Sequence, residues 1–379
     1  MQKAAALREQ GRDVISLGAG EPDFETPEPA RRAAHAAIDG GKTHYTPCPG
    51  EKSLRQALVR KLERENGLRY SFDEVLVSNG AKQSLFNAFA ALLDPGDVVL
   101  IPTPYWVTYP EAARLVGARP RLLPTRPEQG FKIVPGELDR ALKNVRLFVF
   151  NSPCNPTGAV HDESELRALG EVLERHDCWI VTDEIYEKLV FDGASHRSLP
   201  AVCPRLRDRT IVVNGFSKAY AMTGWRLGYA AGPRAAIDAM ELVQSHTTSN
   251  ACSISQHAAL GALSSDGREV AAMVAAFARR RRLVLDALQQ VPGLRLVPPQ
   301  GAFYVFPDVS PWLDGAASGT AALCERILDE TGVALVAGEA FGDPRCIRFS
   351  YATSDSQLVE ALARLKKFFA GVVPAGGRR

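Results

Sequence analysis

Short apolar segments alternate with longer stretches of mixed apolar and polar residues through the middle of the chain. The apolar segments lie at residues 75–77, 98–101, 146–150, 179–182 and 210–213 and are rich in valine, isoleucine, leucine and phenylalanine. Segments of this length and composition predict strands, and the stretches between them predict helices. This alternation is typical of an α/β fold with a mainly parallel sheet flanked by helices.

A polar or Gly/Pro-rich loop follows each predicted strand. The loops begin near Ser78, Pro102, Asn151, Asp183 and Asn214. In open α/β sheets ligands bind beyond the carboxyl ends of the strands, so we expect these loops to converge at one edge. The residues with distinctive chemistry fall in these loops and not in the helices between them.

The pattern changes near Met273. A long Ala/Arg/Leu helix is followed by predicted strands at residues 294–297, 301–306 and 346–351. Strands mixed with helices predict a smaller α+β domain, with which the N-terminal stretch packs. We therefore expect a large domain at residues 30–272 and a small domain made of residues 1–29 and 273–379.

Two shorter features lie in this part of the chain. The run of four arginines at residues 279–282 predicts a solvated helix face. Residues 375–379 predict a frayed tail.

Composition narrows the functional classes. With 379 residues and 46% hydrophobic content, the chain can build a large core. Its 45 basic and 43 acidic residues nearly balance, which gives no reason to expect nucleic acid or an anionic membrane as a partner. No apolar run has the length of a membrane span, and no signal peptide is apparent.

Cysteine usage bears on location and on metals. The seven cysteines are scattered, with no Cys-x-x-Cys motif and no cysteine/histidine cluster. This pattern predicts reduced thiols in the cytoplasm and no metal site.

Lys218 and Arg226 carry the strongest chemical signal. Lys218 follows the predicted strand at 210–213, and Arg226 comes eight positions later. A buried lysine can form a Schiff base with an aldehyde, and a guanidinium fork can hold a phosphate. Ser217 can add a hydroxyl donor to the phosphate. Pyridoxal phosphate (PLP) carries both groups and is the predicted cofactor, whereas a lone Lys218 would be read as a surface lysine.

Other loop residues fit the same cofactor. Gly80 opens a predicted helix whose free N–H groups would attract phosphate. Asp183 could keep a pyridine nitrogen protonated, or it could cap a helix. Tyr186 and Asn155 could donate to the ring's phenolic oxygen, although Asn155 also suits a turn before proline. Trp106 could stack on the ring or pack in the core.

Arg348 lies between apolar neighbours in a predicted strand. A buried arginine needs an anionic partner. A substrate carboxylate and a structural salt bridge both satisfy this need.

Together these residues resemble the fold-type I PLP-dependent aminotransferases, most closely the bacterial aspartate aminotransferase subgroup Ib. The resemblance extends from about Val14 to the last helix. It rests on Gly-Glu-Pro-Asp-Phe at 20–24, Thr-His-Tyr-Thr-Pro at 43–47, Gly-Ala-Lys-Gln at 80–83, Pro-Tyr-Trp-Val at 104–107, Asn-Ser-Pro-Cys-Asn-Pro-Thr-Gly at 151–158, Asp-Glu-Ile-Tyr at 183–186, Ser-Lys at 217–218, Gly-Trp-Arg-Leu-Gly-Tyr at 224–229, Gly-Ala-Phe-Tyr at 301–304 and Arg-Phe-Ser-Tyr at 348–351.

The resemblance implies a role for each matching position. Lys218 would bind PLP and shuttle the substrate proton, Asp183 would hold the pyridinium, Tyr186 and Asn155 would bind the phenolic oxygen, and Trp106 would stack on the ring. The phosphate would be held by Gly80, Ala81, Ser217 and Arg226, with Lys82 in the same loop. Arg348, Gly20, Asn155 and Trp106 would bind the substrate. Tyr45 would reach the phosphate of a neighbouring subunit, which implies a homodimer with shared sites.

The same resemblance implies ping-pong transfer of an amino group between an L-amino acid, expected to be aspartate or glutamate, and a 2-oxo acid such as 2-oxoglutarate. A dicarboxylate needs a second cation, and Lys82 is the candidate, with a surface lysine as the alternative reading. Relatives usually have a further stretch before the position of Val14, so we expect either a start upstream of Met1 or loss of that stretch. In relatives that also use prephenate the stretch contributes to selectivity, which leaves aspartate, prephenate and aromatic substrates open.

Two other functions share the cofactor. A β-lyase on the same scaffold would release pyruvate and ammonia without an amino acceptor. A PLP-binding regulator would need a DNA-binding domain or a basic patch, and the sequence shows neither.

Overall fold

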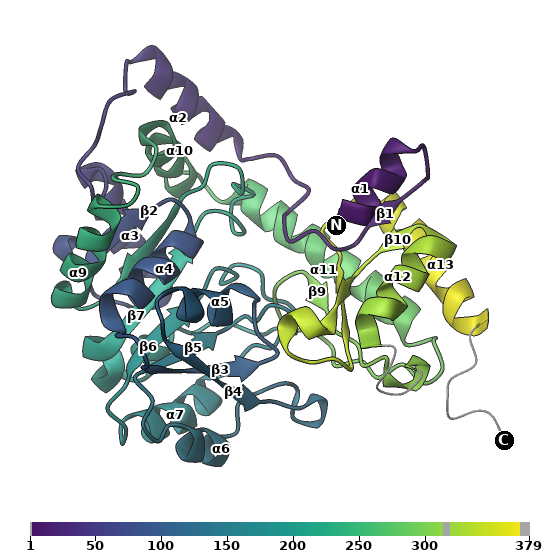
Figure 1. The fold of residues 1–379 in the computed structure, drawn as a ribbon. Coiled ribbons are helices and arrows are strands. Elements are labelled where there is room, and N and C mark those ends of the chain that lie inside the picture. Colours follow the sequence, from purple (N-terminus) through teal and green to yellow (C-terminus); the bar gives the residue numbers. More distant parts are fainter. Residues whose placement is uncertain (1, 314–318, 372–379) are drawn as a thin grey trace.

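A seven-stranded sheet forms the centre of the larger part of the molecule (Figure 1). The computed structural model describes residues 2–313 and 319–371, so the predicted tail lies outside the described residues. In spatial order the strands are β2 (Val75–Ser78), β8 (Gly228–Ala231), β7 (Thr210–Gly215), β6 (Trp179–Asp183), β5 (Leu147–Asn151), β3 (Val98–Thr103) and β4 (Arg119–Pro124). β8 runs antiparallel to both of its neighbours, and the other six strands all run in one direction. The predicted α/β class and all five predicted strands are confirmed.

Apolar side chains alternate between the two faces of this sheet. In β7, Ile211 and Val213 contribute to one core, and Val212 between them contributes to another. The first face is covered by α4 (Ala81–Leu92), α5 (Thr108–Leu115) and α9 (Arg234–Ser245). The other is covered by α6 (Pro135–Ala141), α7 (Glu163–Leu173) and α8 (Leu199–Val202), and by α2 (Glu28–Asp39), α3 (Lys52–Lys61) and α10 (Ser253–Leu263). Burial on both faces explains why the central strands are continuously apolar.

A smaller α+β part combines the two ends of the chain (Figure 1). Its helices are α1 (Gln2–Glu9), α11 (Arg268–Leu288), α12 (Gly319–Thr331) and α13 (Asp355–Gly371). Its strands form a parallel pair, β1 (Ile15–Ser16) with β10 (Val333–Ala334), and an antiparallel sheet of β11 (Val336–Ala337), β12 (Ile347–Ser350) and β9 (Tyr304–Val305). One core joins Leu17 to side chains of α11 and α13. The predicted domain boundaries at 29/30 and 272/273 stay a prediction.

Two details of this part differ from expectation. The predicted strand at 294–297 is wrong: only Arg295 pairs, in a single bridge with Asp308. Pro298 and Pro299 follow it and lack the N–H groups that would extend a ladder.

The arginine run is also not a solvated face. Arg280 and Arg281 are only 6% and 5% exposed, and each is paired with a carboxylate. Successive residues of a helix point about 100° apart, so four in a row cannot share one face.

Among the described residues, no helix is both long and apolar enough to cross a membrane.

Candidate active site

A cavity of about 600 Å³ lies at the carboxyl edge of the large sheet. The carboxyl ends of five strands lie at this edge: β2, β3, β5, β6 and β7. The last four are paired in parallel, and β2 has the same direction because both it and β7 are antiparallel to β8. The cavity is lined by these predicted site residues: Gly20, Ala81, Lys82, Trp106, Asn155, Asp183, Tyr186, Ser217, Lys218, Arg226 and Arg348. Residues separated by more than 300 positions therefore meet in one site.

The Lys218 amine is buried at the centre of this site. Its Nζ donates to the Gly20 carbonyl at 2.5 Å. The pKa of Lys218 is lowered to about 8, mainly by burial and also by Arg226 and Arg348, while Glu21 opposes the shift. A lysine of this pKa is partly neutral near physiological pH and can act as a nucleophile or a base.

Asp183 ends β6 inside the cavity. Burial raises the pKa of its carboxyl to about 6, whereas hydrogen bonds from Tyr109 Oη and the Ile185 N–H favour the ionised form. No helix begins at Asp183 in the described structure, because a turn follows it. The carboxylate therefore has no helix to cap and suits a cationic partner such as a protonated ring nitrogen.

The loop after β2 leaves a cradle at the start of α4. Gly80 has a φ of +86°, and a methyl group at its Cα would lie 2.6 Å from Arg226 Nη2. α4 begins without a side-chain cap, and its first backbone N–H groups, those of Ala81 and Lys82, come before the hydrogen bonds that Gln83 and Ser84 make to the Gly80 carbonyl. Within the described residues Arg226 forms no ion pair, and it donates to the Thr223 carbonyl. Backbone N–H groups beside a guanidinium fork suit a phosphate.

Arg348 is buried on the opposite side of the cavity. It donates to Asn155 Oδ1 and to the Gly18 carbonyl, both at 2.9 Å, and its planar guanidinium lies over the Tyr304 ring. Its buried Nε has no hydrogen-bond partner. Among the described residues no carboxylate pairs with Arg348, so the alternative of a structural salt bridge is not seen. A buried cation with a free donor suits an incoming carboxylate.

Aromatic side chains close two sides of the cavity. Tyr186 Oη and Tyr304 Oη are 2.9 Å apart, and burial raises the pKa of both hydroxyls, so both are neutral donors. The rings of Trp106 and Tyr109 pack edge to face, with their centres 5.6 Å apart. Lys82 Nζ lies 5.0 Å from the centre of the Trp106 ring. The lysine predicted to bind a side-chain carboxylate therefore lies at the same wall as the predicted stacking ring.

Two predicted residues lie outside this cavity. Gly80 touches it only through the Arg226 contact. Tyr45 is 91% exposed and does not line it. A role for Tyr45 therefore requires a second copy of the chain.

Sequence reasoning missed several lining residues, namely Glu21, Tyr109, Asn151, Ile185, Thr223, Gly224 and Tyr304. Tyr109 lies three residues after Trp106, and its N–H donates to the Trp106 carbonyl at the start of α5. That spacing was the available signal. Tyr304 belongs to the Gly-Ala-Phe-Tyr motif but had no assigned role.

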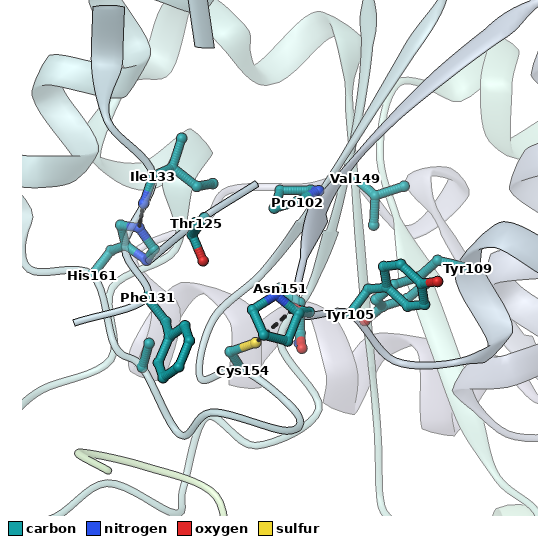
Figure 2. Close-up of a pocket in the computed structure, with 12 residues that line it drawn as sticks. Pro102, Tyr105, Tyr109, Thr125, Phe131, Ile133, Val149, Asn151, Cys154 and His161 are labelled. Carbon is teal, nitrogen blue, oxygen red and sulfur yellow. Dashed lines mark hydrogen bonds between the residues drawn. The ribbon is translucent and has the colours of Figure 1, made fainter. Parts of the chain in front are cut away.

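A second, smaller cavity of about 30 Å³ lies beside the first and shares Tyr109 and Asn151 with it (Figure 2). His161 borders it, with Nε2 accepting from the Ile133 N–H at 3.2 Å. Burial lowers the pKa of His161 to about 3, so this imidazole is neutral. At this size the cavity excludes a substrate, and its mainly apolar wall supports the turn that carries Asn155.

Behind Asp183, the segment 184–187 is anchored by a buried polar cluster. Glu184 accepts from Ser198 and bonds to His196, and Glu187 pairs with Lys61. Despite burial, Lys61 and His196 hold the pKa of Glu187 at about 2. These two carboxylates and the imidazole are close enough to hold a metal ion, but the ammonium of Lys61 already supplies the positive charge.

The chain is similar to known proteins over almost its whole length. A family model described as "Aminotransferase class I and II" matches residues 12–365. The aspartate/prephenate aminotransferase of Cereibacter sphaeroides is 49% identical, over 98% of this chain and 94% of that protein. The aspartate aminotransferase of Geobacillus stearothermophilus is 45% identical, over 97% of this chain and 94% of that protein. The structure of Thermus thermophilus aspartate aminotransferase with maleate superposes with a TM-score of 0.92 and 44% identity, covering 97% of this chain and 94% of that one.

Proposed function

Because the chain belongs to the class I and II aminotransferase family, we propose that it transfers the amino group of L-aspartate or L-glutamate to a 2-oxo acid such as 2-oxoglutarate. Enzymes of this family depend on PLP, and this chain is a PLP-dependent aminotransferase. One observation carries the proposal: the buried amine of Lys218 shares a cavity with Asp183, Arg226 and Arg348. These four groups match an aldehyde, a ring nitrogen, a phosphate and a substrate carboxylate.

The residues present fit PLP. The cradle at Gly80 would be filled by a Cβ, which accords with a phosphate approaching the backbone there. We assign the phosphate to Gly80, Ala81, Ser217 and Arg226, with Lys82 in the same loop. When bound, PLP supplies an aldehyde that links to a lysine and a protonated ring that withdraws electrons from the substrate's Cα–H bond.

Four side chains are proposed to hold the ring. Asp183 accepts from the ring nitrogen and keeps it protonated. The neutral Tyr186 hydroxyl and the Asn155 amide donate to the ring oxygen. Trp106 stacks on the ring face.

Lys218 is proposed to act twice. Its amine would hold the cofactor's aldehyde, and the same amine, when free, would take the proton from the substrate Cα. A pKa of about 8 suits both tasks, because the neutral amine is accessible near neutral pH.

Substrate orientation is proposed to begin with the α-carboxylate. Arg348 has a buried, unpartnered Nε, and Asn155 and Gly20 border the same space. Lys82 is proposed to bind the side-chain carboxylate of a dicarboxylic substrate, with Trp106 forming the wall beside it. Lys82 forms no ion pair within the described chain, which leaves its charge available.

We also propose a homodimer with shared sites. Tyr45, although aromatic, is 91% exposed, and the family resemblance assigns it to the partner's phosphate. A groove of about 670 Å³ adjoins the site, shares Lys82 and Arg226 with it, and exposes Val107 and Leu115. Exposed apolar side chains at the rim of a site suit coverage by a second copy.

We also propose a cytoplasmic location and a two-domain organisation. All seven cysteines are free thiols, as expected for a reducing cytoplasm. We retain residues 30–272 as the large PLP-binding domain, with 1–29 and 273–379 as the small domain.

Prephenate is the second candidate substrate. The Cereibacter sphaeroides relative is named for both aspartate and prephenate. Arogenate, the amino product of prephenate, would then be a donor in the reverse direction.

The substrate proposal is tested by adding single amino acids to PLP-loaded protein and following the cofactor's absorbance. Conversion to the amine form should be fastest with aspartate and glutamate. Faster conversion with phenylalanine, tyrosine, alanine or arogenate would contradict the aspartate/glutamate assignment and leave the aminotransferase assignment intact.

A further inference from the structure

Arg280 forms a fork-shaped ion pair that links three parts of the chain. Its Nη1 and Nη2 donate to the two oxygens of Asp23 at 2.6 and 2.9 Å, and its Nε donates to Asp355 Oδ1 at 2.7 Å. The guanidinium also lies 5.0 Å from the centre of the Phe24 ring. Arg280 is buried, and Nε, Nη1 and Nη2 all have carboxylate partners. The two-point contact therefore holds Asp23 in a defined position.

Asp23 ends a segment that lines the active-site cavity through Gly20 and Glu21. We call residues 18–23 the strap. Its carbonyls accept from two groups of the site: Gly20 O from Lys218 and Gly18 O from Arg348. A Cβ at Gly20 would lie 2.9 Å from Tyr304 Oη, so the strap has little free space beneath it.

The two ends of the strap are held differently. At its start, Leu17 exchanges backbone hydrogen bonds with Ala334 and Ser350. At its far end, the tie is the Asp23 side chain on Arg280. Beyond it, Thr26 donates to the Ala221 carbonyl and accepts from Trp225. Between the two ends, Glu21 accepts from Thr223 Oγ1 at 3.1 Å. Arg280 holds the far end of the strap through an ion pair.

We propose that Arg280 and Asp23 are positioning residues for substrate binding: their pairing sets the distance of the strap from Arg348 and Lys218. The incoming α-carboxylate must share Arg348 with the Gly18 carbonyl, so a displaced strap changes the geometry of that guanidinium. A misplacement of about 1 Å can cost roughly 100-fold in rate. This inference rests on the proposed function, because it assigns Arg348 to the substrate.

Asp355 supplies a matched control. It pairs with the same guanidinium at nearly the same distance, but it begins α13 and does not belong to the strap. Asp23→Asn and Asp355→Asn therefore remove equivalent charges from Arg280, and only the first releases the strap. Arg279, which pairs with Asp355 alone, gives a second control as Arg279→Ala.

The test compares the PLP-loaded variants in KM, kcat, maleate binding and thermal unfolding. Maleate is a dicarboxylate without an amino group, so its binding reports the pocket without turnover. We expect Asp23→Asn to raise KM for aspartate and the maleate Kd about 10-fold, or ~1.4 kcal/mol, with a smaller change in kcat. Asp355→Asn and Arg279→Ala should keep wild-type values for both. Arg280→Lys should lie between wild type and Asp23→Asn, because an ammonium keeps the charge but loses the fork.

The inference is overturned if Asp23→Asn and Asp355→Asn change KM and maleate binding equally, or if both change only the unfolding temperature. That outcome would assign the pair to stability alone. Failure of the wild-type protein to convert aspartate would instead count against the proposed function, so the two failures are distinguishable.

Discussion

Tyr109 Oη donates a 2.8 Å hydrogen bond to Asp183 Oδ2 in the buried wall of the active site. The two residues come from α5 and β6, which the sheet brings together. The bond favours the ionised carboxylate, whereas burial raises the pKa of Asp183 to about 6. Tyr109 therefore favours the charged carboxylate near neutral pH, the form that the proposed contact with the PLP ring nitrogen requires.

Tyr109→Phe should move the acidic limb of the rate profile to higher pH. Removing a hydrogen bond to a charged group, worth about 1.5 kcal/mol, should raise the pKa of Asp183 by roughly one unit. Activity is lost as pH falls through this pKa, so turnover at pH 6 should drop about 5-fold while turnover at pH 8 changes little. Tyr105→Phe is the control, because Tyr105 lies outside the main cavity. An unchanged acidic limb in Tyr109→Phe would refute the role of this bond.

The apo-protein should capture PLP faster as pH rises through about 8. The neutral amine of Lys218 is the attacking form, and burial lowers its pKa from 10.5 to about 8. Stopped-flow mixing across this range should show the rise levelling above pH 8. Pyridoxamine phosphate, which lacks the aldehyde, should not show it. A midpoint near 10.5 would contradict the buried, partly neutral lysine.

Lys82→Ala should discriminate between substrates. Loss of a charge-assisted bond worth about 1.5–3 kcal/mol should lower kcat/KM for aspartate by roughly 10- to 100-fold, mainly through KM. The value for phenylalanine should stay nearly unchanged, since its side chain carries no charge. Equal losses for both amino acids would show that Lys82 does not bind the side-chain carboxylate.

Mixing two inactive variants should restore activity if sites are shared. In a homodimer of Tyr45→Ala with Lys218→Ala, one site carries both changes and the other carries neither. After subunit exchange about half of the dimers are mixed, so activity should reach about a quarter of wild type. Each variant alone, treated in the same way, is the control. No gain on mixing would place Tyr45 outside the neighbouring site.

Much of the fold was predictable because the buried strands are short, apolar and separated by turn residues. β4 and β8 were not predicted, for two different reasons. β4 is an edge strand that contains Pro120 and Pro124, which local propensity counts against a strand. β8 consists of Gly228 and small residues except for Tyr229, and its strand form depends on pairing with β2 and β7.

The site was predictable where chemistry sits at the end of a strand, as for Asp183 and Lys218. It was not predictable where a function depends on packing between distant elements. Tyr109 acquires its role only because α5 lies against the end of β6. Arg280 was predicted as a surface arginine, and its burial and its pairing with Asp23 of the strap appear only in the structure. In both cases the partner is far away in sequence, and local patterns carry no record of it.

A single half-reaction tests whether Lys218 catalyses transamination. PLP-loaded protein is mixed with L-aspartate in the absence of any 2-oxo acid, and oxaloacetate and ammonia are measured. A ping-pong aminotransferase should release about one equivalent of oxaloacetate per site, no ammonia, and then stop until 2-oxoglutarate is added. Lys218→Ala should release neither product. Continuous release of ammonia without an acceptor would instead identify a lyase, and near-native conversion by Lys218→Ala would contradict the assignment of the catalytic lysine.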